Sequence, residues 1–181
     1  MNKNTGCKKL WAPWRMKYIE GMNPSQSGGC LFCEMPGKQD DENTYIVMRA
    51  KTCYVIMNIY PYNNGHVMVV PYRHTPNLGY LSAEERLELM DVINLIIETI
   101  KSIMRPDGFN IGMNLGRVAG AGVEDHIHMH IVPRWNGDTN FMPIIGNAKV
   151  ICESLEDTYA RLKKALAAGK EKHEIHQSDN G

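Results

Sequence analysis

The sequence predicts a single domain that combines β-strands with two α-helices. Two kinds of periodicity support this class: short stretches that alternate apolar and polar residues or are rich in β-branched residues, and longer stretches with apolar residues at helical spacing. The expected strands cover residues 45–48, 53–58, 66–71, 109–115 and 126–132, and the expected helices cover residues 82–104 and 154–169. With 181 residues, 43% of them hydrophobic, the chain is long enough to bury one core.

The N-terminal residues 1–22 are interpreted as an aromatic arm, because Trp11, Trp14 and Tyr18 lie within eight positions of one another. Such a segment either packs on its own domain or reaches a second subunit or a ligand base. The sequence favours neither alternative.

Two cysteines follow a loop rich in Gly and Ser. Cys30 and Cys33 are spaced so that both thiolates can bind one tetrahedral metal ion. The alternative is a redox pair, but a redox pair usually opens a helix that follows a core strand. Residues 34–43 are polar and are expected to form a loop.

The first three strands lead into the long helix. The Asn-Gly pair at 64–65 predicts a tight turn before the third strand. Ser82 and Glu85 form a capping box, and the apolar positions behind them recur at helical spacing to about Met104. A Pro-Asp-Gly sequence at 106–108 is expected to end this helix.

A glycine-rich loop joins the fourth strand to the fifth. Glycines at 116, 120 and 122 let the backbone approach a ligand closely and direct amide groups at an anion. Between Asn114 and the histidines that follow, this loop predicts a phosphate site.

The fifth strand carries His126, His128 and His130. Side chains in a strand alternate between faces, so these histidines share one face and Ile127, Met129 and Ile131 share the other. A core has no need of three imidazoles in a row, because each buried ring requires partners for two nitrogens. Two chemistries fit the row: metal coordination, and nucleophilic attack by one imidazole that its neighbours orient.

The C-terminal part begins with a polar and aromatic loop at 134–143. Ser154 is expected to cap the last helix, with acidic residues in its first turn and lysines near its end, as the helix dipole favours. Gly169 is expected to end it, and residues 170–181 are expected to be a disordered tail.

Composition excludes several classes of protein. The chain has 20 Lys and Arg against 20 Asp and Glu, which argues against binding a nucleic acid polymer or a membrane surface. It holds no stretch of about 20 apolar residues and no signal peptide at its N-terminus, so a cytoplasmic location is expected. Five cysteines with one close pair do not indicate a disulfide framework.

The residues His126-Ile127-His128-Met129-His130-Ile131-Val132 resemble the signature of the histidine triad (HIT) superfamily, in which three histidines alternate with apolar residues. The resemblance runs from about Cys30 to Trp135 and includes Asn58, residues 65–71, Ser82 with its helix, and residues 114–116. The segments 10–19 and 132–142 resemble the branch that contains bacterial diadenosine tetraphosphate phosphorylases.

This resemblance implies an α+β fold with a five-stranded antiparallel sheet, a long helix packed on it and a C-terminal helix. The HIT domain would cover residues 23–150, and residues 151–169 would form the C-terminal helix. Family members are usually homodimers whose sheet continues across the interface.

The resemblance also implies the catalytic and substrate-binding residues. His128 matches the nucleophile, which forms a nucleotidyl-histidine at the α-phosphorus, and His130 and His66 match histidines that contact phosphate oxygens or the leaving group. Asn58 matches a ribose-binding residue. The further substrate-binding residues are Asn114, Gly120, Ala121, Gly122 and Trp135.

Family members with a Cys-x-x-Cys pair often hold a structural zinc ion, and the matching ligands here are Cys30, Cys33, His74 and His126. The chain departs from many family hydrolases because residues 118–123 offer no hydroxyl or amide side chain to assist the leaving group. The interval from Asn114 to His126 is also about one residue longer than in the dinucleotide hydrolases.

The expected function is therefore cleavage of dinucleoside polyphosphates, with an AMP-containing nucleotide as substrate and phosphorolysis slightly favoured over hydrolysis. Three alternatives remain: a nucleoside phosphoramidate hydrolase, a zinc-containing nucleotide-binding protein with little turnover, and a metalloenzyme that binds one ion through His126, His128 and His130 together.

Overall fold

The computed structural model describes residues 29–141, 145 and 150–178, with side chains described up to residue 169. The chain divides into two units, one made of residues 1–28 and 139–150 and the other of residues 29–138 and 151–181. The aromatic arm at 1–22 lies outside the described residues. The second unit holds every strand and helix discussed below.

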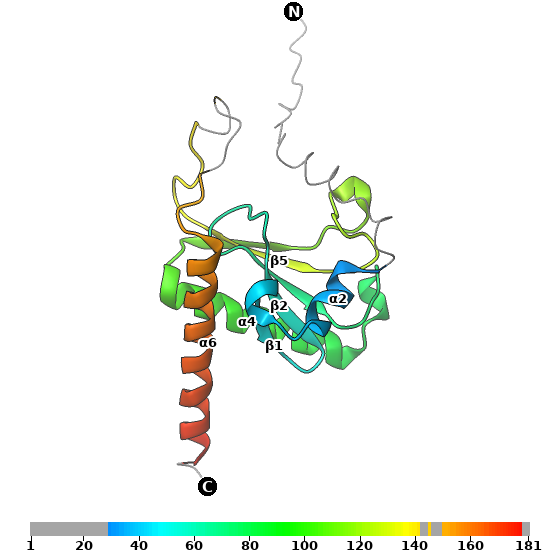
Figure 1. Ribbon diagram of the computed structural model, residues 1–181, viewed down its shortest axis with the longest axis horizontal. Helices are drawn as coiled ribbons and strands as arrows, with labels where there is room; N and C mark the ends of the chain where they lie inside the picture. Colours follow the sequence, from blue (N-terminus) through cyan, green and yellow to red (C-terminus); the bar gives the residue numbers. More distant parts are fainter. Residues whose placement is uncertain (1–28, 142–144, 146–149, 179–181) are drawn as a thin grey trace, which may run out of the picture. The chain divides into compact units, whose positions relative to one another are not determined.

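A five-stranded antiparallel sheet forms the centre of this unit (Figure 1). Its strands are β1 (Ile46–Arg49), β2 (Cys53–Met57), β3 (Val67–Pro71), β4 (Gly108–Gly112) and β5 (Met129–Arg134). They lie in the order β1-β2-β3-β5-β4, and each pair of neighbours is antiparallel. The expected α+β fold with five antiparallel strands is confirmed, and β4 is an edge strand.

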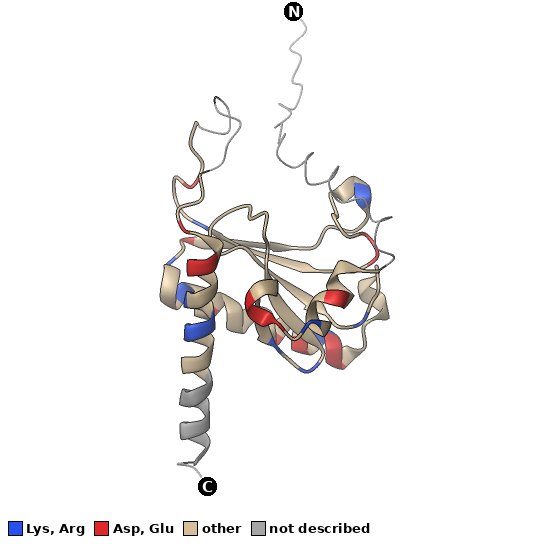
Figure 2. Cartoon of the chain, viewed as in Figure 1, with Lys and Arg blue, Asp and Glu red and all other residues tan. Residues whose placement is uncertain are grey.

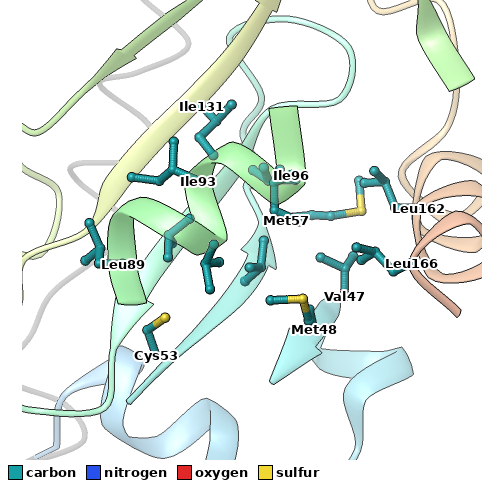
Figure 3. Close-up of a cluster of buried hydrophobic side chains, with 14 of the residues drawn as sticks. Val47, Met48, Cys53, Met57, Leu89, Ile93, Ile96, Ile131, Leu162 and Leu166 are labelled. Atoms are coloured by element: carbon teal, nitrogen blue, oxygen red, sulfur yellow. The ribbon is translucent and has the colours of Figure 1, made fainter. Parts of the chain in front are cut away.

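Helix α4 (Ala83–Met104) packs against one face of the sheet. Its start has the predicted capping box, since the Ser82 hydroxyl accepts from the Glu85 amide while the Glu85 carboxylate accepts from the Ser82 amide. Leu89, Ile93 and Ile96 from α4 meet side chains of the strands in the main core cluster (Figure 3).

Helix α6 (Leu155–Ser178) contributes Leu162 and Leu166 to the same cluster (Figure 3). The prediction that Gly169 ends this helix is wrong. A glycine inside a helix costs only about 1 kcal/mol relative to alanine, and the Ala, Lys and Glu residues around it are good helix formers.

The other face of the sheet carries a smaller cluster of buried residues. Two short helices lie before β1, α2 (Leu31–Gly37) and α3 (Asp41–Thr44), so the loop predicted for residues 34–43 is wrong. Tertiary contacts stabilise these polar segments: Arg49 donates to the Pro36 carbonyl and pairs with Asp41. The cluster consists of Phe32, Ile46, Tyr54, Ile56, Met68 and Val70.

Two 3-10 turns complete the unit, η1 (Leu78–Tyr80) before α4 and η2 (Arg117–Ala119) in the glycine-rich loop. Both acidic and basic residues occur on the described elements, and on α6 the acidic residues of the first turn are followed by basic residues (Figure 2). Among the described residues, no helix combines the length and the apolar character that crossing a bilayer requires.

Candidate functional site

The three histidines of the triad lie on the face of the sheet that carries α2. On the opposite face, Ile127 and Ile131 belong to the main core, and Met129 packs against it. His130 is paired with Met68 of β3, a member of the smaller cluster. The alternation predicted from the sequence is therefore confirmed, although the hydrogen-bonded ladder of β5 begins only at Met129.

The ring of His128 has a defined tautomer. Its Nδ1 lies 2.9 Å from the carbonyl oxygen of His126, and because a carbonyl only accepts, this nitrogen must carry the proton. In the neutral ring, the lone pair is then on Nε2. Burial lowers the pKa of His128, so the ring is neutral at pH 7. A neutral imidazole with a lone pair on Nε2 can attack an electrophile.

A second pair of histidines lies next to this ring. The Tyr62 amide donates to Nδ1 of His66 over 3.0 Å, so Nε2 carries the proton of the neutral His66 ring. That nitrogen is 2.9 Å from Nδ1 of His130, which accepts, and the His130 proton is therefore on Nε2. The His130 ring centroid is 4.9 Å from that of His128. Two consecutive hydrogen bonds thus connect the Tyr62 amide, through His66, to His130 of the triad.

Asn58 contacts His66 of the same histidine pair. Its amide group lies 3.4 Å from Nδ1 of His66, and its oxygen accepts from the Tyr60 amide over 3.0 Å. The structure therefore places Asn58 beside His66, directly after the end of β2.

Cys30, Cys33, His74 and His126 converge on one point. One ligand atom from each lies within 4.8 Å of the other three. The Cys30 sulfur is 3.3 Å from Nδ1 of His126, and the Cys33 sulfur is 3.4 Å from Nδ1 of His74. Sulfur at about 2.3 Å and nitrogen at about 2.0 Å from one tetrahedral zinc ion would be about 3.5 Å apart. The donor set and its spacing fit zinc.

The surroundings of these four groups also favour a cation. Nε2 of His126 lies 2.8 Å from the Pro71 carbonyl and therefore donates, which leaves Nδ1 unprotonated and facing the sulfurs. Burial and the neighbouring Cys30 sulfur raise the pKa of Cys33 to about 11. Two thiolates this close repel each other unless a positive ion lies between them.

The triad histidines do not converge on a common metal position. His126 directs Nδ1 at the cysteines, whereas the same nitrogen donates to a carbonyl in His128 and contacts His66 in His130. This arrangement speaks against the metalloenzyme alternative, in which all three would bind one ion.

The glycine-rich loop is organised by its own hydrogen bonds. Gly116 and Gly120 have positive φ angles of 79° and 91°, which favour glycine, and the Asn114 amide group is 3.5 Å from the Gly120 carbonyl. The Gly120 and Ala121 amides donate to carbonyls within the loop. Among the three residues predicted to bind phosphate, the described hydrogen bonds leave the Gly122 amide available.

Trp135 lies beyond the far end of β5. It is half-buried, and its amide donates to Asp138, whose carboxylate also forms an ion pair with Arg134. It follows His130 by five residues, which is about 16 Å along an extended strand. The structure therefore does not bring Trp135 next to the histidines.

Two aromatic rings that the sequence did not single out contact the histidines. Phe32 is 4.8 Å from the ring of His128, and Tyr62 is 4.6 Å from His66 and 5.7 Å from His130 between ring centroids. The position of Phe32 between the two cysteines was the available signal, since an aromatic residue there must accompany both ligands.

Comparisons with known proteins all point to one family. A family model of the HIT domain matches residues 39–137. The AP-4-A phosphorylase of Mycobacterium tuberculosis is 45% identical over 157 residues, which cover 83% of this chain and 80% of that protein. The adenosine 5'-monophosphoramidase hnt1 of Schizosaccharomyces pombe is 27% identical over 107 residues, 59% of this chain and 75% of that protein.

Among solved structures, a Zn-bound histidine triad family protein from Mycobacterium smegmatis matches with a TM-score of 0.63 and 27% identity. The match covers 80% of this chain and 98% of that protein.

Proposed function

Because this chain belongs to the HIT family of enzymes, we propose that it cleaves dinucleoside polyphosphates such as diadenosine tetraphosphate at the α-phosphate. The reaction passes through a nucleotidyl intermediate on His128, with phosphorolysis slightly favoured over hydrolysis. The observation that carries the proposal is the tautomer of His128, which keeps the Nε2 lone pair available as the nucleophile.

In the first step, Nε2 of His128 attacks the α-phosphorus and forms a P–N bond. The P–O bond to the polyphosphate leaving group breaks, and its electron pair goes to the leaving oxygen. The ring keeps its Nδ1 proton and becomes cationic, and the carbonyl oxygen of His126 at 2.9 Å stabilises that charge.

In the second step, an oxygen of inorganic phosphate, or water, attacks the same phosphorus. The P–N bond breaks and its electron pair returns to Nε2, so the ring regains its starting tautomer. From diadenosine tetraphosphate the products are ATP and ADP with phosphate as acceptor, and ATP and AMP with water.

The proton of Nε2 in His130 serves the leaving group. A polyphosphate oxygen that gains an electron pair is stabilised by a hydrogen-bond donor, and His66 behind His130 keeps that donor in place. Residues 118–123 carry no hydroxyl or amide side chain that could stabilise the leaving oxygen. The histidine pair must therefore supply more of this stabilisation.

Substrate binding is assigned to the residues around these rings. Asn58 beside His66 binds ribose, while Asn114 and the amides of residues 120–122, Gly122 first among them, contact phosphate. Trp135, about 16 Å along the strand from His130, would contact the second nucleoside of a long substrate.

A structural zinc ion on Cys30, Cys33, His74 and His126 completes the proposal. These four protein ligands would complete its coordination, so the ion would supply rigidity and would take no part in the bond changes.

The direct test is turnover of diadenosine tetraphosphate with and without inorganic phosphate, followed by identification of the products. ADP with ATP supports phosphorolysis, and AMP with ATP supports hydrolysis. If the metal-loaded protein forms neither pair of products, the proposed substrate class is refuted.

His128→Ala tests the nucleophile. It should lower kcat by at least about a thousandfold, because removal of a nucleophile abolishes the intermediate, while binding of the dinucleotide is kept. His173→Ala, near the C-terminal end of α6, serves as the control. Turnover by His128→Ala close to that of the control would contradict the assignment.

Two alternatives use the same site. A nucleoside phosphoramidate hydrolase is the second candidate, favoured by the similarity to hnt1. Competition between a phosphoramidate and diadenosine tetraphosphate, compared by kcat/KM, separates the two. A nucleotide-binding protein with little turnover would form no trappable nucleotidyl-histidine with either substrate.

We also propose that the chain forms a homodimer through β4 and α4. β4 is an edge strand in which Ile111 is 45% exposed. On α4, Leu87, Met90 and Leu95 are 46–65% exposed. An unpaired strand edge and an apolar helix surface favour a second copy that covers both.

A further inference from the structure

Phe32 is the residue between the two proposed metal ligands of α2. Its side chain is 4% exposed, and its ring centroid lies 4.8 Å from that of His128 and 5.6 Å from that of His126. One aromatic ring thus contacts both the proposed nucleophile and a proposed metal ligand.

The main chain of Phe32 is held from several sides. The hydroxyl of Tyr54, a fully buried residue of β2, donates to the Phe32 carbonyl over 2.7 Å. The amides of Cys33 and Glu34 both donate to the Cys30 carbonyl, which closes the first turn of α2. The ring therefore occupies a fixed position above the sheet.

The ring of His128 needs such a neighbour. The torsion that rotates an imidazole about its Cβ–Cγ bond has broad, roughly two-fold preferences, so it does not select one orientation by itself. A half-turn would exchange Nδ1 with a ring carbon, break the bond to the His126 carbonyl and displace Nε2. Only the hydrogen bond and the packing of neighbouring side chains keep the ring in place.

We propose that Phe32 is a positioning residue for His128: its ring packs against the imidazole and keeps Nδ1 on the His126 carbonyl and Nε2 aimed at the substrate. The inference deepens the proposed function and rests on it. Phe32 does not touch the reacting atoms and acts only through the histidine.

The proposal connects the metal site with the chemistry. Cys30 and Cys33 flank Phe32, so an ion bound to both sulfurs anchors the segment that carries the ring. The metal then influences turnover through the packing of Phe32. A role for Phe32 in the core alone would affect stability and leave the orientation of His128 unchanged.

The test compares variants of the metal-loaded, full-length protein. Phe32→Ala removes the ring, Phe32→Leu keeps an apolar side chain of intermediate size, and Tyr54→Phe removes only the hydroxyl that holds the Phe32 carbonyl. Two matched controls lie away from α2. Leu166→Ala removes a buried side chain of the main core cluster, and Tyr45→Phe, at a residue packed against that cluster, removes a hydroxyl that donates to Glu156.

Three measurements are made on every variant: zinc per chain, steady-state kcat and KM with diadenosine tetraphosphate, and the tautomer of His128 by NMR of protein labelled with 15N in histidine. Phe32→Ala is expected to lower kcat by about a hundredfold, the size of effect that a small misplacement can have. KM should stay within about threefold, since ground-state binding is untouched. The His128 signals should show both tautomers in exchange.

Phe32→Leu should recover part of kcat and most of the single tautomer, and Tyr54→Phe should give a smaller loss of kcat. The controls should keep the wild-type kcat per folded, zinc-loaded molecule. Two results would overturn the proposal. One is a kcat per folded, zinc-loaded molecule that is the same for Phe32→Ala and Leu166→Ala, and the other is a single His128 tautomer in Phe32→Ala.

Failure of the proposed function is recognised separately. If the wild-type protein does not turn over the dinucleotide, the substrate class is wrong, while the NMR comparison still decides whether Phe32 holds the ring. If Phe32→Ala does not fold, Phe32→Leu and Tyr54→Phe decide by the same criteria.

Discussion

The proposed function assigns three tasks to the three histidines of the triad, and the structure engages different ring nitrogens in each of them. His126 donates from Nε2 to the Pro71 carbonyl and directs Nδ1 at the cysteines. His128 donates from Nδ1 and keeps the lone pair on Nε2. His130 accepts at Nδ1 from His66. The side chains are chemically identical, and their different roles come from the hydrogen-bond partner that each one meets.

The state of His128 gives a prediction for pH dependence. Burial lowers its pKa, so the neutral ring persists below the ordinary histidine value of about 6.5 and protonates only at more acidic pH. The rate at which the nucleotidyl-histidine forms should therefore fall as the pH is lowered, with the midpoint of this fall below pH 6.5.

Single turnover without inorganic phosphate is the suitable measurement, because the acceptor itself titrates near neutral pH. The dependence of kcat/KM on pH for this step gives the pKa values of the essential groups in the free enzyme. A midpoint above pH 6.5 would contradict the assignment of a buried, neutral nucleophile.

At the scale of secondary structure, α2 is the element that differs most from expectation. Its seven residues contain one sulfur ligand and the ring that packs on His128, and its N-cap residue Cys30 supplies the other sulfur. Helix α2 has only seven residues and includes Pro36, so its own helix propensity is weak. Its stability must come from tertiary contacts and, if the proposed zinc ion is bound, from that ion.

Removal of the metal should therefore loosen α2 before the rest of the domain. We expect one zinc ion per chain, and a chelator should lower Tm by roughly 5–11 °C. A ligand present at 100 times its Kd stabilises by about 2.7 kcal/mol, and each kcal/mol is worth about 2–4 °C at this chain length.

Hydrogen exchange should locate the change. Amides of residues 31–37 should lose protection, while those of α4 should keep it. Cys33→Ser should imitate the chelator, whereas Cys152→Ser, at an exposed cysteine outside the cluster, should not. Equal loss of protection in α2 and α4 would contradict a local role for the metal.

How far the sequence predicts these features depends on how local their causes are. The strand alternation at 126–132 and the capping box at Ser82 follow from neighbouring residues, and both are found in the structure. The four proposed metal ligands came from the family resemblance, since nothing near His74 in the chain indicates its partners. The helices before β1 depend on contacts with residues outside those helices, and the tautomer of His128 depends on the path of the backbone at His126; hydrophobic periodicity encodes neither.

At the scale of the whole molecule, the balanced charge leaves shape and apolar surface to determine association. Residues 110–112 of the edge strand β4 are exposed, and α4 exposes Leu87 and Met90. A second copy of the chain is the partner that the proposed function assigns to these surfaces.

Gly112→Pro tests the proposed dimer. Proline has no amide hydrogen and is poorly tolerated in a paired strand, so the variant should be monomeric by light scattering at micromolar concentration. Tyr80→Lys, at a residue of η1 that is 69% exposed, should leave the dimer intact. A Gly112→Pro protein that remains dimeric would exclude a continuous sheet across the interface.

The hydrogen-bond acceptor of the His128 ring is a main-chain oxygen of residue 126. Every amino acid supplies that oxygen, so no point mutation can delete it. His126→Ala removes an imidazole from the metal cluster and still leaves a carbonyl for Nδ1 of His128. Single substitutions can thus remove a ligand of the proposed zinc site, whereas the hydrogen-bond acceptor of the proposed nucleophile is lost only when the backbone itself moves.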